Sequence, residues 1–150
     1  MKNLYEPAAA KEIKDRIARL GPSNERQWGK MHAAQAMAHC AITMEWAVGD
    51  KTEPRMLLGR IFGPMVKSMA LKDEAPMGKN APTAKSLVVN DDRDLSKECA
   101  RLSALVERFA AAGPRGCTKN PHTFFGQMTP DEWSQLMYKH LDHHLRQFGV

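Results

Sequence analysis

Histidines near the end of the chain have the spacing of metal ligands. His140, His143 and His144 lie in the stretch Thr129 to Gly149, whose apolar residues recur with helical periodicity. Residues four apart on a helix share a face, with Cβ atoms about 5–6 Å apart, so His140 and His144 can chelate one ion. A helical wheel places His144 inside the apolar arc, His140 at its margin, and His143 further out toward water. Two imidazoles therefore point toward a core.

Two imidazoles in a core need partners, because an unpaired polar group costs about 1–3 kcal/mol in a protein interior. A metal ion shared by both rings meets this need. A hydrogen-bonded pair of core histidines meets it equally well. The last helix alone leaves both interpretations open, and a third ligand from another helix favours the ion.

His39 is the candidate for that third ligand. It lies on a helix predicted from Gly29 to Val48, in the middle of an inward face. This helix has a second apolar strip on its opposite side, which is typical of a central helix packed on two sides. We expect the last helix to be one of its neighbours. The sequence thus predicts His39, His140 and His144 as ligands of one divalent metal ion, with a fourth position open to water or substrate.

Three further polar side chains are candidates for substrate binding: His32, Gln35 and His143. His32 shares the face of His39 but lies about 10 Å along the helix axis, so a cavity-lining or helix-end position is the alternative. Gln35 is one turn from His39, and a polar core contact is its alternative role. His122 precedes the last helix, and about 16 Å of helix separates the helix start at Thr129 from His140, so we do not expect His122 to reach the ion. We expect it to cap or pack its loop.

The helical pattern predicts an all-α fold with a single domain over residues 1–150. The four long helices are expected over Pro7–Leu20, Gly29–Val48, Asp92–Ala112 (capped by Asn90 or Asp91) and from the capping box at Thr129 to Gly149. Residues 51–91 form the crossover between the second and third of these: a short helix over Pro54–Phe62, a break or kink at Gly63-Pro64, a resumed helix over Met65–Lys72, then a long loop. Such a loop is often a lid or a binding loop.

The composition is that of a globular protein, with 43% hydrophobic and 26% charged residues in 150. Three cysteines without paired spacing argue against a disulfide framework and favour a reducing compartment. There is neither an apolar run long enough to span a bilayer nor a signal-peptide pattern at the N-terminus. We therefore expect a cytoplasmic protein with no membrane association.

The formal charge of +5 raises the question of nucleic-acid binding. Basic residues are interspersed with acidic ones along most of the chain, so no nucleic-acid partner is expected. Only residues 55–85 are clearly basic, with apolar residues between the charges. A solvated face is the default interpretation of this segment, and binding to a membrane surface or an anionic ligand is the alternative.

Several stretches resemble a known superfamily. One histidine late in the second long helix and the run His140-Leu141-Asp142-His143-His144 in the last are similar to the metal-binding four-helix bundles of the DinB/YfiT-like superfamily. The stretches Trp28–Cys40, His122–Gly126 and Thr129–Trp133 are similar to an uncharacterised branch of it. The resemblance implies a DinB-like four-helix bundle, with His39, His140 and His144 as ligands of nickel or zinc.

The resemblance also implies a function, which is metal-dependent chemistry on a small molecule. Some members act as thiol S-transferases with a low-molecular-weight thiol, and a hydrolase-like reaction is a related expectation. The sequence shows no general base, and Leu145-Arg146-Gln147 departs from the arginine-glycine-glutamine run usual after the histidines. The alternative is a non-enzymatic stress-response or binding bundle with a structural or vestigial histidine site. A homodimer is also expected from the resemblance, and the apolar residues of 56–69 offer a surface for it.

Overall fold

The computed structural model describes residues 1–81 and 83–150, and these residues are helical without any β-strand. The α-helices are α1 (Pro7–Arg19), α2 (Ala33–Ala47), α3 (Leu57–Ala70), α4 (Leu95–Ala112) and α5 (Pro130–Gln147), and two short 3-10 helices are η1 (Lys85–Leu87) and η2 (Pro114–Gly116). The predicted all-α class is confirmed. None of the helices in these two ranges combines the length and hydropathy that crossing a bilayer requires.

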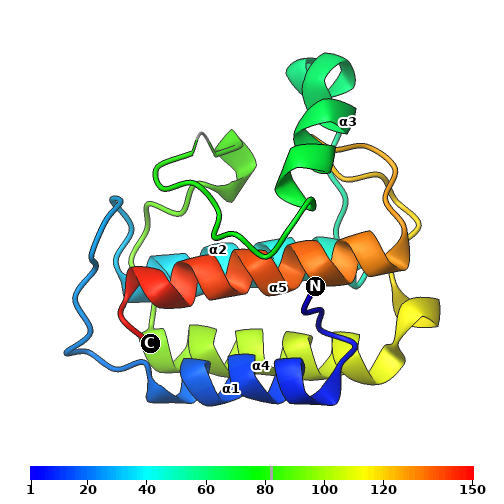
Figure 1. Cartoon of the computed structure of the whole chain (residues 1–150). Helices are drawn as coiled ribbons and strands as arrows, with labels where there is room; N and C mark the ends of the chain where they lie inside the picture. The colour runs from blue at the N-terminus through cyan, green and yellow to red at the C-terminus, as the bar shows by residue number, and fades with distance from the viewer. Residues whose placement is uncertain (82) are drawn as a thin grey trace.

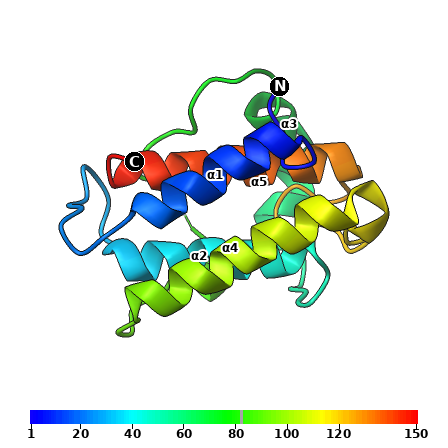
Figure 2. The ribbon, with the colours of Figure 1, turned by 90° about the horizontal axis from the view of Figure 1, so that it is seen from below.

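Four helices surround one hydrophobic core. Helix α2 packs against α4 and α5, and α1 packs against the same two helices (Figures 1 and 2). Fully buried side chains fill the space between them, among them Met37, Met44, Leu102, Phe109 and Leu141. Because α2 contributes to both of its neighbours, its two apolar strips are both used, as the sequence predicted.

The N-terminus of α5 is the one most clearly encoded in the sequence. The Thr129 hydroxyl accepts a hydrogen bond from the backbone N–H of Glu132, and the Glu132 carboxylate accepts one from the N–H of Thr129. Pro130 occupies the first turn, where its missing N–H leaves no helical bond unmade. The predicted capping box is confirmed, and it fixes the register of the helix that carries two of the candidate ligands.

Helix α2 begins at Ala33, four residues later than predicted. Gly29 has φ of +79°, a left-handed conformation that no helix can continue through. His32 then caps α2, because its Nδ1 accepts from the N–H of Gln35 while the Gln35 side chain accepts from the N–H of His32. A reciprocal capping box built on histidine was not foreseen, since this residue is not among the preferred caps.

Helix α4 also begins later than predicted, at Leu95. The carboxylate of Asp94 accepts from the N–H of Lys97 and caps the helix, so the prediction of Asn90 or Asp91 as the cap was wrong. Asp91 instead pairs with Arg93 at 3.0 Å. Asp91 therefore belongs to the segment that leads into the helix.

Helix α3 runs without interruption through Pro64, so the break predicted as one outcome at Gly63-Pro64 was wrong, while the alternative, a kink, stays a prediction. The helix lies outside the four-helix core, on the side of α2 and α5 away from α1 and α4 (Figure 1). Its glycines Gly59 and Gly63 lie directly against the backbone of Phe124, where an added Cβ would overlap the carbonyl oxygen. This close approach to a supporting loop holds the helix before the proline, and after it the Lys67 ammonium donates to the Gln127 carbonyl of the same loop.

Candidate metal centre

His39 of α2 and His140 and His144 of α5 form one cluster, called here the histidine triad. One ring nitrogen of each lies within 4.8 Å of the others. The Nε2 atoms of His39 and His140 are 2.9 Å apart. His39 and His144 are buried, and His140 is partly exposed. The predicted juxtaposition of the three side chains is confirmed, whereas their binding of an ion stays a prediction.

The outer nitrogen of His39 is fixed by the crossover segment. Its Nδ1 lies 2.8 Å from the backbone carbonyl oxygen of Leu87, in η1. A carbonyl can only accept, so Nδ1 carries the hydrogen. The neutral ring then has its lone pair on Nε2, which faces His140.

The outer nitrogen of His140 is fixed from within α2. Its Nδ1 lies 3.2 Å from the hydroxyl oxygen of Thr43. That hydroxyl donates its own hydrogen to the Cys40 carbonyl at 2.8 Å, so its oxygen accepts from the imidazole. Nδ1 of His140 therefore carries the hydrogen, and Nε2 again carries the free lone pair.

The outer nitrogen of His144 is fixed by a side chain one turn further along α5. Its Nδ1 lies 2.9 Å from Oε1 of Gln147. The amide orientation follows from the other end of that side chain, because Nε2 of Gln147 donates to the Trp28 carbonyl at 2.7 Å. His144 thus also keeps its hydrogen on Nδ1 and its lone pair on Nε2.

All three rings are held neutral with their Nε2 lone pairs converging. Burial is the main cause that lowers the pKa of His39 and, more strongly, that of His140. For His144 burial lowers the pKa to about 3. Lone pairs that face each other without a proton repel, and a cation between them turns that repulsion into coordination. Ligands around a tetrahedral zinc ion stand about 3.3 Å apart at ordinary Zn–N lengths, which suits this cluster.

Carboxylates near the triad are engaged elsewhere. Asp142 pairs with Arg16 at 2.6 Å and with Arg146 at 2.8 Å. Glu45 pairs with Arg101 and with Lys51. Within the described residues, no carboxylate or thiol joins the three histidines as a ligand. The donor set is therefore three imidazoles, with any further position left to water or substrate.

His143 lies at the edge of the triad. Its ring centroid is 5.0 Å from that of His144 and 5.6 Å from that of Trp28. Burial lowers its pKa, against an opposing hydrogen bond with the backbone of Met77 in the crossover loop. The ammonium group of Lys79 lies 4.3 Å above the Trp28 ring. The loop thus reaches the triad from outside, and the predicted role of His143 in substrate binding stays a prediction.

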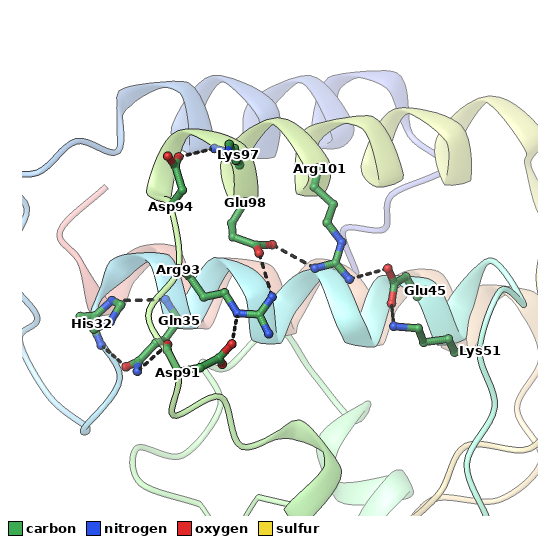
Figure 3. A network of polar contacts seen from close by, with 10 residues as sticks. All are labelled: His32, Gln35, Glu45, Lys51, Asp91, Arg93, Asp94, Lys97, Glu98 and Arg101. Atoms are coloured by element: carbon green, nitrogen blue, oxygen red, sulfur yellow. Dashed lines mark hydrogen bonds and ion pairs between the residues drawn. The ribbon is translucent and has the colours of Figure 1, made fainter.

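His32 and Gln35 form the capping box at the start of α2, at one end of a network of polar side chains (Figure 3). Nε2 of Gln35 also donates to the Asp91 carbonyl at 3.3 Å. The network continues through Arg93, Glu98 and Arg101 to Glu45 near the other end of α2. This network connects α2 with α4 and with the segment that follows η1. The predicted role of His32 and Gln35 in substrate binding is not tested by this placement.

His122 organises its own loop, as predicted. Its Nδ1 accepts hydrogen bonds from the backbone N–H groups of Phe124 and Phe125, each at 3.1 Å, and its ring stacks on that of Phe125. Burial lowers its pKa to about 4, because the charged ring would lose hydration. This is the loop on which α3 rests.

The sequence analysis missed the groups that orient the triad. Thr43 lies one turn after His39 on the same helix, and Gln147 lies three residues after His144, so both had a spacing that could have revealed them. The third such group, the Leu87 carbonyl, is a backbone atom and has no signature in a sequence.

Comparison with known families gives one match. The family described as "Protein of unknown function (DUF1569)" matches residues 4–149. The chain belongs to this family. The DUF1569 match spans all five α-helices and therefore the whole triad. No curated protein and no solved structure matches the chain. The family description names no activity, so functional inference begins from the site.

Proposed function

We propose that this DUF1569 protein binds one divalent metal ion through the Nε2 atoms of His39, His140 and His144. One observation carries the proposal: each of the three Nδ1–H groups has its own acceptor, so all three lone pairs are directed inward. Metal-binding histidines commonly donate their other nitrogen in this way, which fixes the tautomer and the ring orientation. A hydrogen-bonded pair of core histidines would need an inward lone pair on only one nitrogen of one of its two rings.

The proposal extends to a DinB/YfiT-type four-helix bundle. The arrangement of α1, α2, α4 and α5, with the crossover between α2 and α4 reaching the site, supports this kinship. Nickel and zinc are the ions we propose, since neutral imidazoles suit both. The three unpaired cysteines support a reducing compartment such as the cytoplasm.

A metal-dependent enzyme acting on a small molecule is the first candidate activity. A bound divalent ion supplies Lewis acidity to a thiol or a water molecule in the open position. A low-molecular-weight thiol is the proposed class of substrate, because the three imidazoles leave a coordination position for a ligand from outside the chain. Thr43, Gln147 and the Leu87 carbonyl would hold the rings in place while substrate exchanges. Thiol S-transfer is the proposed reaction, with a hydrolase-like reaction next.

A non-enzymatic metal-binding bundle is the second candidate. The observation that favours it is the pairing of Glu45 and Asp142 with arginines, which leaves no carboxylate of the described residues beside the triad to serve as a general base. The two candidates share the metal site and differ in turnover. Assays of the metal-loaded protein with low-molecular-weight thiols and an electrophilic acceptor separate them.

The metal content of untagged protein tests the site itself. We expect about one equivalent of zinc or nickel per chain by elemental analysis, and less than about a tenth of that in His140→Ala, because two imidazoles bind far more weakly than three. His32→Asn is the matched control, since it removes a histidine on the same helix as His39 and keeps a preferred cap. A wild-type protein that stays metal-free after reconstitution with either ion would refute the proposal.

A further inference from the structure

The segment that leads from η1 into α4, residues 87–94, is held along α2 and is called here the return segment. Two side chains on one face of α2 bind its backbone. Nδ1 of His39 lies 2.8 Å from the Leu87 carbonyl oxygen, and Nε2 of Gln35 donates to the Asp91 carbonyl at 3.3 Å. Gln35 and His39 are one helical turn apart, and their partners follow in the opposite order, so the segment runs antiparallel to α2.

Arg93 holds the end of the return segment that enters α4 (Figure 3). Its guanidinium group lies 3.0 Å from the carboxylate of Asp91 and 3.3 Å from that of Glu98. Glu98 is only 7% exposed, and Arg101 pairs with its second oxygen at 3.0 Å. A carboxylate this buried needs such partners, which fixes Arg93 on α4. Val89 of the segment is also buried, so polar and apolar contacts both set the position of the Leu87 carbonyl.

His39 has two possible positions for its single ring hydrogen. With the hydrogen on Nδ1, the ring donates to the Leu87 carbonyl and leaves the Nε2 lone pair for an ion. With the hydrogen on Nε2, the ring would donate to Nε2 of His140, which lies 2.9 Å away. The second form is the hydrogen-bonded pair of core histidines, and its hydrogen occupies the place of the ion. A carbonyl can only accept, so Leu87 stabilises the first form alone.

We propose that the return segment keeps His39 in its metal-binding form, and that Gln35 and Arg93 are positioning residues of the metal centre. This inference rests on the proposed function, since it concerns the readiness of the same three nitrogens for an ion. When the segment leaves α2, the Nδ1–H group loses its acceptor. The ring then releases that proton to solvent and takes one up on Nε2, where His140 accepts its hydrogen bond. The ring stays neutral throughout.

The proposal connects the hydrogen position of His39 with the affinity for metal. An ion binds only the fraction of molecules whose Nε2 lone pair is free, so the apparent dissociation constant is the intrinsic one divided by that fraction. A variant with one molecule in ten in the metal-binding form should bind zinc about tenfold more weakly. That loss lies at the lower end of the range, about 10–100-fold, for changes in groups that orient metal ligands.

Gln35→Met tests the tie between α2 and the return segment. The new side chain is similar in length and uncharged, but it cannot donate to the Asp91 carbonyl. Because Gln35 also forms one half of the α2 capping box, the matched control is His32→Ala, which removes the other half and leaves the bond to Asp91 in place. Circular dichroism of each metal-free variant verifies that the helices are intact.

Two measurements are made on each protein: proton–nitrogen NMR of the His39 ring without metal, and the zinc dissociation constant by competition with a chelator. In Gln35→Met the His39 nitrogen resonances should move toward those of a ring with its hydrogen on Nε2, and the dissociation constant should rise about tenfold. The ring of His144 should keep its hydrogen on Nδ1. His32→Ala should match the wild type in both measurements.

A second pair of variants tests the tie to α4. Arg93→Gln removes the charge that pairs with Asp91 and Glu98, and it should change both measurements in the same direction as Gln35→Met. Arg93→Lys should bind zinc more tightly than Arg93→Gln, because its ammonium group can still donate to Glu98. A structural defect unrelated to the ligand would weaken the fold without moving the hydrogen of His39.

Three results would overturn the proposal. Gln35→Met and Arg93→Gln with the zinc affinity and His39 resonances of the wild type would show that the return segment does not control the ring. Weaker zinc binding with the His39 hydrogen still on Nδ1 would show that the variants act by another route. The same loss in His32→Ala would assign the effect to the helix cap. A wild-type protein that binds no zinc would refute the proposed function instead, and the metal-free spectra would still test the return segment.

Discussion

Zinc at about 100 times its dissociation constant raises the melting temperature of the wild-type protein by about 5–10 °C. An ion that binds only the folded chain at this concentration stabilises it by about 2.7 kcal/mol. For a domain of this size, each kcal/mol corresponds to about 2–4 °C. The effect arises because His39 comes from α2 while His140 and His144 come from α5, so the ion cross-links two helices that separate on unfolding. Differential scanning calorimetry with and without a chelator measures the shift.

The His144→Ala variant is expected to lose this shift. Its melting temperature without metal will also change, because the substitution leaves Oε1 of Gln147 without its donor, so the comparison concerns the difference that zinc makes within each protein. His32→Asn should keep the full zinc shift. Equal shifts in the wild type and in His144→Ala would place the stabilising ion outside the triad.

Acid should destabilise the protein through His122. With a pKa of about 4 in the folded state and an ordinary value near 6.5 when unfolded, the unfolded chain binds one more proton between these two pH values. The free energy of unfolding therefore falls as the pH drops from about 6.5 toward 4, and this contribution levels off below. Between pH 7.5 and 4.5 the loss from this residue amounts to about 2.5 kcal/mol.

His122→Asn isolates that contribution. The Asn amide oxygen can accept from the N–H groups of Phe124 and Phe125 as Nδ1 of His122 does, and it does not titrate in this range. The variant should be the less stable protein at pH 7.5, and the difference from the wild type should shrink by about 2.5 kcal/mol at pH 4.5. Urea unfolding at both pH values, with a chelator present throughout, measures it. A difference that stays constant with pH would show that His122 is readily protonated in the folded protein.

The sequence predicts the positions of the triad because helical periodicity is a local property. Once α2 and α5 are recognised as apolar helices, the four-residue spacing of His140 and His144 and the central position of His39 determine which way the rings face. The capping box at Thr129 determines where α5 begins and therefore fixes its register. These features depend on neighbours in the chain, and the structure confirms them.

The errors concern segments whose structure depends on distant contacts. Pro64 carries a local signal for a helix break, but the support that α3 receives from the loop at Phe124 comes from residues about sixty positions away. The same holds for the Leu87 carbonyl, which reaches His39 only after the crossover has folded back over α2. A pattern of residue types contains no record of such contacts.

The exposed face of α3 shows a third kind of limit. Periodicity identifies residues 57–69 as an amphipathic helix but does not tell which side faces the core. In the structure the glycines decide it, since only a side without Cβ atoms can approach the Phe124 backbone so closely. The large apolar residues are consequently directed outward, away from the four-helix core.

The most direct test of the central claim is long-range proton–nitrogen NMR of the histidine rings, before and after addition of one equivalent of zinc. We expect His39, His140 and His144 to be neutral with the hydrogen on Nδ1 in the metal-free protein. On zinc binding their three Nε2 resonances should move together to metal-coordinated values, while those of His32 and His122 stay in place. Nε2 resonances of the triad that do not respond to zinc, or a ring with its hydrogen on Nε2, would contradict the proposed site.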